Sequence, residues 1–65
     1  MSFGKQMRLR REELQLSRAS LAEMLGVSPS AISNYENGKN VPDIFKMWEL
    51  ADIFDITLDE LVGRE

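Results

Sequence analysis

A short break between two helical segments, at residues 25–29, constrains this chain more than any other feature. Gly26 follows the last apolar residue of one amphipathic segment, and glycine readily adopts the positive φ that ends a helix in a tight turn. Two residues later, Ser28 and Pro29 favour a helix start, because serine caps free N–H groups and proline fits the first helical position. The sequence therefore predicts two helices joined by a short turn.

The rest of the chain carries the same kind of signal. Apolar residues recur at spacings near 3.6, and no segment alternates as a half-buried strand does. Ser17 and Thr57 are good N-caps, and Asn37-Gly38 ends a helix before a loop that runs to Pro42. We expect an all-α fold, a single domain over residues 1–65, with five helices at about 2–14, 18–25, 29–36, 44–54 and 58–62.

The apolar faces of these helices predict the core. We expect the inward residues to be Phe3, Met7, Leu14, Leu21, Ala22, Leu25, Ile32, Tyr35, Ile44, Met47, Leu50, Ala51 and Phe54. A chain of 65 residues has room for one small core of this kind.

The composition excludes several functions. The chain has no cysteine and no histidine, so it lacks thiolate metal ligands, a thiol nucleophile and the commonest general base. No apolar run approaches the ~20 residues that span a bilayer, and the N-terminus has no signal-peptide core. We expect a cytoplasmic protein that is not an enzyme, needs no cofactor or metal, and has no membrane partner.

Charge is divided unequally along the chain. Residues 1–40 carry six basic and four acidic residues, a net charge of +2, whereas residues 41–65 carry two basic and seven acidic residues, a net charge of −5. A polyanion could therefore approach only the first part of the chain.

Two helices that meet at a steep angle need small and apolar residues at the crossing. Ala22 is small and lies in the middle of the first helix, while Val27 and Ile32 supply apolar contacts and Tyr35 completes them. The second helix then exposes a face of small or amide side chains: Pro29, Ser30, Ser33, Asn34 and Asn37. In isolation, such a face is most often only solvated.

In this context the sequence resembles the phage repressor and Cro-like (XRE-type) helix-turn-helix regulators. The resemblance runs from about Met7 to Val62, with the helix-turn-helix at about 18–37. Its most specific pieces are Leu16-Ser17, Leu21-Ala22, Leu25-Gly26-Val27-Ser28, Ile32-Ser33, Glu36-Asn37-Gly38-Lys39, Pro42, Leu50-Ala51 and Leu58-Asp59-Glu60-Leu61. It implies a five-helix DNA-binding domain whose third helix enters the major groove, and dimers on half-sites roughly 34 Å apart.

The resemblance also implies roles for particular positions. The residues expected to face DNA bases are Ser28, Pro29, Ser30, Ser33 and Asn34. Asn34 is the best candidate for direct readout, since an amide can bond both N6 and N7 of adenine. The residues expected to contact phosphates are Arg18, Asn37, Lys39, Asn40 and Arg11. Arg11 and Glu36 are further expected to form a partly buried ion pair that sets the angle of the recognition helix.

Some positions depart from the family pattern. Gln15 and Asp55 replace a usual glycine after a helix, so we expect both in left-handed conformations. Arg10 replaces a usual core leucine, which predicts a place at the rim of the core. Pro29 replaces a residue that often contacts a base, so specificity should lean on thymine-methyl contact and DNA shape.

These observations favour sequence-specific binding of double-stranded DNA by a small transcriptional repressor or regulator. We expect a homodimer held by Leu58, Leu61 and Val62, and weakened by the surrounding acidic residues Asp55, Asp59, Glu60 and Glu65. The alternative is a protein-interaction module of the same fold, such as an antitoxin or an antirepressor-binding partner. The acidic C-terminal part and an apolar set at Phe45, Trp48 and Ile53 favour that alternative.

Overall fold

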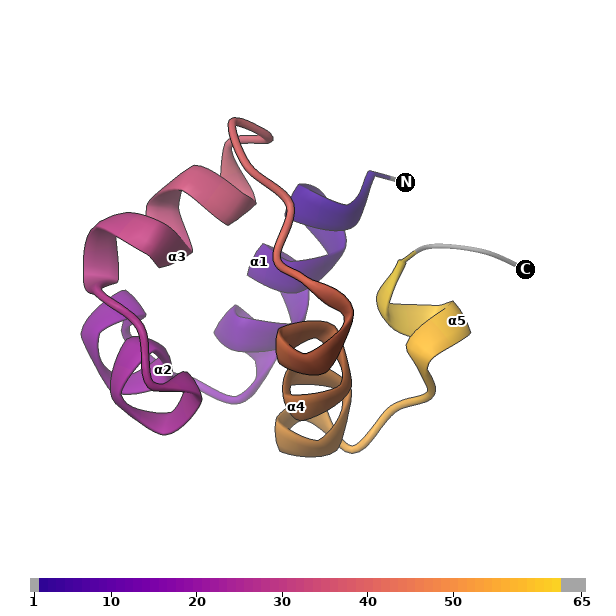
Figure 1. Ribbon diagram of the computed structural model, residues 1–65. Helices are drawn as coiled ribbons and strands as arrows, with labels where there is room; N and C mark the ends of the chain where they lie inside the picture. Colours follow the sequence, from indigo (N-terminus) through magenta and orange to yellow (C-terminus); the bar gives the residue numbers. More distant parts are fainter. Residues whose placement is uncertain (1, 63–65) are drawn as a thin grey trace.

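The computed structural model describes residues 2–62, which fold into five α-helices with no strand in that range (Figure 1). The helices are α1 (Phe3–Glu13), α2 (Arg18–Leu25), α3 (Pro29–Glu36), α4 (Ile44–Phe54) and α5 (Leu58–Leu61). The all-α prediction and the expected helix order are confirmed. None of the helices described is long and apolar enough to cross a membrane.

The helix ends form where local chemistry predicts them. The hydroxyl of Ser17 accepts a hydrogen bond from the N–H of Ser20 at 3.0 Å, and the hydroxyl of Ser28 accepts one from Ala31 at 3.1 Å. Gly26 ends α2 with a φ of 77°. These bonds satisfy backbone donors that have no partner inside the helix, so each helix starts at a defined residue.

Two residues without glycine's freedom adopt left-handed backbone conformations after a helix. Gln15 has a φ of 57° and Asp55 a φ of 55°, as the departure from the family pattern predicts. The left-handed conformation costs roughly 1–2 kcal/mol for a residue with a Cβ atom. At Asp55, the N–H donates to the carbonyl of Asp52 at 3.1 Å, which closes the end of α4.

The core is small and apolar. Its buried members are Met7, Leu21, Ala22, Leu25, Ile32, Leu50, Ala51, Phe54 and Leu61. The prediction is wrong at Leu14 and Ile44, which are 49% and 45% exposed. Leu14 is the residue that ends α1 and Ile44 the first residue of α4, so each lies at the end of an apolar stripe, where no neighbouring helix covers it.

The arrangement of the helices separates two surfaces. In Figure 1, α2 and α3 lie together on the left, α1 and α4 occupy the centre, and α5 lies on the right. Helix α1 packs against both α3 and α5, while α4 packs against α2 and α5. The exposed face of α3 and the acidic helix α5 therefore lie on opposite sides of the molecule.

The structure corrects two assignments in the C-terminal part. Leu61 is fully buried in the core, so it is not available as a surface residue for a dimer interface. Ile53 is half-buried and packs against the core, so it does not belong to the exposed apolar set with Phe45 and Trp48. Leu61 is covered because α5 packs against α1 and α4. The predicted acidic neighbour Glu65 lies outside the described residues.

Candidate nucleic-acid interface

The first turns of α3 present the polar face that the sequence predicts. Ser28, Pro29 and Ser30 are exposed, and Ser33 and Asn34 follow on the same helix with half-buried side chains. Ile32, on the opposite side of α3, is fully buried against the core. The burial of Ile32 fixes the orientation of α3 about its own axis. In this orientation the small polar side chains lie on the side of α3 that faces away from the core.

Asn34 has its amide available for an external partner. Among residues 2–62, no other group forms a hydrogen bond with this side-chain amide. Its backbone carbonyl accepts the N–H of Lys39 at 2.9 Å and that of Asn40 at 3.4 Å, which ties the following loop to α3. The backbone of Asn34 is therefore fixed while its amide is free to pair with the edge of a base.

The loop after α3 gathers three residues expected to contact phosphate. Asn37, Lys39 and Asn40 are exposed, and the two bonds to the carbonyl of Asn34 hold the last two close to the end of α3. Gly38 makes the turn with a φ of 79°, a conformation that favours glycine. One ammonium and two amide side chains therefore lie in the loop that follows the exposed face of α3.

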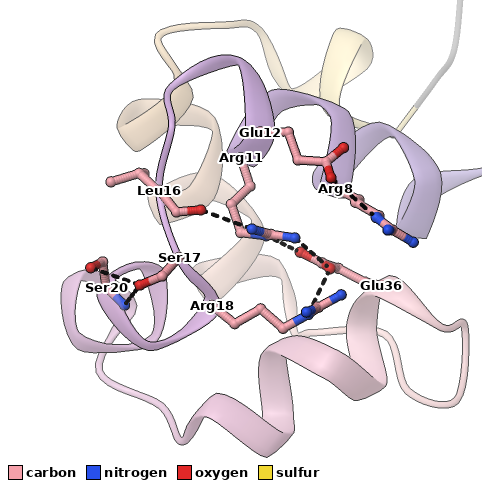
Figure 2. A network of polar contacts seen from close by, with 8 residues as sticks. All are labelled: Arg8, Arg11, Glu12, Leu16, Ser17, Arg18, Ser20 and Glu36. Carbon is pink, nitrogen blue, oxygen red and sulfur yellow. Dashed lines mark hydrogen bonds and ion pairs between the residues drawn. The ribbon is translucent and has the colours of Figure 1, made fainter.

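A buried ion pair fixes α1 to the end of α3, as predicted (Figure 2). Arg11 donates from Nε to Oε2 of Glu36 at 2.7 Å and from Nη2 to Oε1 at 3.3 Å, a bidentate pair. Its Nη1 donates to the carbonyl of Leu16 at 2.8 Å. All three nitrogens of the guanidinium are thus engaged in a residue only 7% exposed, and this burial disfavours the predicted phosphate contact of Arg11.

Arg18 joins the same carboxylate from α2. Its Nε donates to Oε1 of Glu36 at 3.2 Å, and Figure 2 shows the side chain extending from α2 towards the end of α3. The Arg18 side chain is 43% exposed, whereas that of Glu36 is 1% exposed. One buried negative charge is therefore shared by two guanidinium groups, and the Nη atoms of Arg18 form no hydrogen bond with another described residue.

Arg10 occupies the rim of the core, as predicted. Its side chain is 29% exposed and lies 3.8 Å from carboxylate oxygens of both Glu13 and Glu60. Its Nε is buried without a hydrogen-bond partner among the described residues. This guanidinium connects α1 to α5 on the side of the molecule away from α3.

Two contacts that position the site were not predicted. The bond from Arg18 to Glu36 depends on how α2 crosses α3, and periodicity carries no information about that crossing. Gly4 is buried where α1 meets the end of α3, and a Cβ atom there would lie 2.5 Å from the carbonyl oxygen of Glu36. A glycine inside a helical pattern was the available signal, because it costs about 1 kcal/mol relative to alanine unless packing requires it.

Residues 7–61 match the family described as Helix-turn-helix. The chain is 42% identical over 64 residues to the HTH-type transcriptional repressor RghR of Bacillus subtilis, covering 97% of this chain and 47% of RghR. It is 35% identical over 65 residues to the HTH-type transcriptional activator BcrR of Enterococcus faecalis, covering 100% of this chain and 32% of BcrR. The chain spans between 32% and 57% of the length of the curated relatives it matches.

Solved structures agree with this assignment. The fold is similar to that of the P22 c2 repressor in complex with a synthetic operator, with a TM-score of 0.93 and 29% identity over 100% of this chain and 98% of that chain. A transcriptional regulator from Listeria innocua is equally similar, with a TM-score of 0.93 and 33% identity over 98% of this chain and 60% of that one. The site described above therefore lies in a fold that these regulators share.

Proposed function

The chain belongs to the XRE-type helix-turn-helix family of transcriptional regulators, and on this premise we propose that it binds double-stranded DNA sequence-specifically with α3 in the major groove. The observation that carries the proposal is the unpaired amide of Asn34 on a helix whose partners fix its orientation. The similarity to the P22 c2 repressor, solved with a synthetic operator, supports it.

The contacts divide into two groups. We assign base contacts to the α3 face made by Ser28, Pro29, Ser30, Ser33 and Asn34. We assign phosphate contacts to Arg18 at the start of α2 and to Asn37, Lys39 and Asn40 after α3. Phosphate contacts position the protein and supply most of the salt-dependent affinity, whereas base contacts determine which sequence is bound.

A selection of bound sequences from a random duplex pool tests this function. We expect the parent chain to enrich one sequence motif, and Asn34→Ala to lose about 1–3 kcal/mol on it and to relax base choice at one position. Asn37→Ala is the matched control, because it removes the same amide from a position assigned to phosphate and should weaken all duplexes alike. Failure to enrich any motif, or an unchanged motif with Asn34→Ala, would contradict the assignment.

A symmetric dimer is the proposed way to reach useful specificity, since one recognition helix contacts only a few base pairs. With Leu61 in the core, the remaining candidates on this surface are the exposed parts of Leu58 and Val62. Because Leu58 also packs against the core, Val62→Asp is the cleaner test. It should abolish cooperative filling of a palindromic duplex, measured by sedimentation, while the monomer still binds a single half-site.

A second candidate function is binding another protein. Phe45 and Trp48 are 67% and 51% exposed on α4, and their rings pack edge to face with centroids 5.8 Å apart. Exposed adjacent aromatic side chains are typical of interaction surfaces. This function and DNA binding use different helices, so one chain can have both.

A further inference from the structure

Four exposed apolar side chains lie close together in the chain at the start of α4, and we call them the α4 patch: Val41, just before the helix, and Ile44, Phe45 and Trp48 on it. Their exposed fractions are 67%, 45%, 67% and 51%. The rings of Phe45 and Trp48 contact each other in a T-shaped arrangement. Isolated exposed apolar residues are ordinary, but a group of neighbours that includes two large aromatics marks a binding surface.

Three exposed carboxylates lie near the α4 patch. Asp43 is exposed and directly precedes Ile44, and the spacing of a helix places Glu49 beside Phe45 and Asp52 beside Trp48. Both of these are also exposed. The patch therefore combines exposed apolar side chains with neighbouring carboxylates, which form its rim.

The single basic residue of α4, Lys46, pairs with only one of these carboxylates. Lys46 donates from Nζ to the carbonyl of Leu25 at 2.8 Å, so its ammonium is turned towards the end of α2. It lies 3.6 Å from a carboxylate oxygen of Glu49, which leaves Asp43 and Asp52 without a cationic partner among the described residues. A ligand for this surface must be complementary to negative charge.

We propose that the α4 patch binds a basic amphipathic segment of another protein, with apolar side chains on the Phe45–Trp48 pair and Lys or Arg side chains beside Asp43 and Asp52. A guanidinium can also lie over the exposed ring of Trp48, which adds a cation–π contact. Charge disfavours the two other occupants: a second copy would bring carboxylates against carboxylates, and DNA would be repelled. The inference deepens the second candidate function by naming the class of partner.

A displayed library of helical peptides, with randomised polar positions around fixed apolar anchors, tests the proposal on the full chain. We expect the recovered peptides to be enriched in Lys and Arg. As synthetic peptides they should change the emission of Trp48, the only tryptophan of the chain, and should bind several-fold more weakly at high salt. Enrichment of acidic or neutral peptides, or binding that salt does not weaken, would overturn the proposal.

Matched variants locate the binding surface. Phe45→Ser should weaken peptide binding by at least about tenfold, since it removes an aromatic anchor. Met24→Ser is the control, because Met24 is 54% exposed on α2 and lies outside the α4 patch. If Phe45→Ser lowers the melting temperature, Asp52→Asn provides a second test, since it removes one rim charge and should reduce the salt dependence. Equal loss with Met24→Ser would overturn the assignment to α4.

The outcomes separate this inference from the functions on which it rests. If no peptide is enriched, the protein-binding function and this inference both fail. The DNA-binding proposal is unaffected, because the selection from the random duplex pool tests it separately. If acidic peptides are enriched and Phe45→Ser abolishes their binding, protein binding stands and the inference fails. If the chain self-associates in sedimentation and Phe45→Ser prevents it, the occupant is a second copy and the proposal is wrong.

Discussion

Helices α1–α3 and helices α4–α5 differ in where their charged and apolar side chains lie. In the first region a carboxylate is buried between two guanidinium groups, and the exposed face of α3 is small and polar. In the second region the charges lie on the surface, and large apolar side chains remain exposed beside them. This difference underlies our two proposals, a polyanion for the first region and a basic protein segment for the second.

The difference shows what the buried charge contributes. Removing Glu36 and Arg11 from water costs energy, so their pairing adds little net stability compared with an apolar contact of the same size. The bidentate geometry instead fixes the end of α3 relative to α1 and α2. We infer that this region uses polar contacts for orientation, which base readout requires, whereas the α4 patch needs only an accessible surface.

The largest expected effect comes from breaking the buried pair. Arg11→Ala leaves the carboxylate of Glu36 buried with only the exposed Arg18 beside it. Loss of one partner of a buried pair costs ~3–5 kcal/mol, so we expect a large fall in urea midpoint and melting temperature. Arg8→Ala is the control, because Arg8 is 56% exposed in its pair with Glu12 and should change stability little. Equal unfolding curves for the two variants would contradict a role of the Arg11–Glu36 pair in the stability of the fold.

The close approach of α1 to α3 gives the next effect. Gly4→Ala places a Cβ atom 2.5 Å from the carbonyl oxygen of Glu36 and 2.8 Å from that of Tyr35, both backbone atoms. We expect a loss of about 1–3 kcal/mol from overpacking, although the same change in an open helix would gain about 1 kcal/mol. The sign of the change in unfolding free energy distinguishes the two cases. Lys5→Ala, at the exposed next residue, should be nearly neutral.

The third prediction separates the contribution of Arg18 to DNA binding from its contribution to the stability of the fold. Arg18→Ala should leave the fold nearly as stable, within about 1 kcal/mol, because Arg18 is 43% exposed and Glu36 keeps Arg11. In DNA binding, however, the slope of log K against log salt should fall by about one, as expected for one lost phosphate contact. Lys39→Ala should have the same effect on the slope. An unchanged slope with Arg18→Ala would mean that Arg18 serves only Glu36.

The smallest expected effect is the pH dependence of the capping box that Thr57 and Glu60 form at the start of α5. The N–H and hydroxyl of Thr57 donate to Oε1 of Glu60 at 3.2 and 3.1 Å, and these bonds hold the pKa of Glu60 below its usual value. Because the pKa of Glu60 is lowered, its ionised carboxylate stabilises the folded state. This stabilisation is fully present above the unfolded-state pKa and is lost as the pH falls through the folded-state pKa. We expect the amide shift of Thr57 in NMR to titrate in the acid range. Glu60→Gln should abolish that titration, and a pH-independent shift in the parent chain would contradict the capping box.

Much of this protein was predictable from local signals. Ser17, Ser28 and Thr57 cap helices because a hydroxyl needs only its own backbone two or three residues away. The turn at Gly26 and the pairing of Arg11 with Glu36 were also predicted, the first from conformational preference and the second from a family resemblance. These features depend on neighbours in the chain or on a pattern shared by relatives.

The remaining features were decided by how the helices contact one another. Periodicity shows which face of a helix is apolar, but it does not show how far another helix covers that face. Leu61 and Ile53 are therefore covered although both were expected at the surface, while Leu14 and Ile44 are exposed although both were expected in the core. The shared use of Glu36 by Arg18 was likewise settled only by the crossing of α2 and α3. Local chemistry set the helices and their ends, and tertiary packing set which surfaces remained for a partner, because burial is a property of contacts between segments distant in the chain.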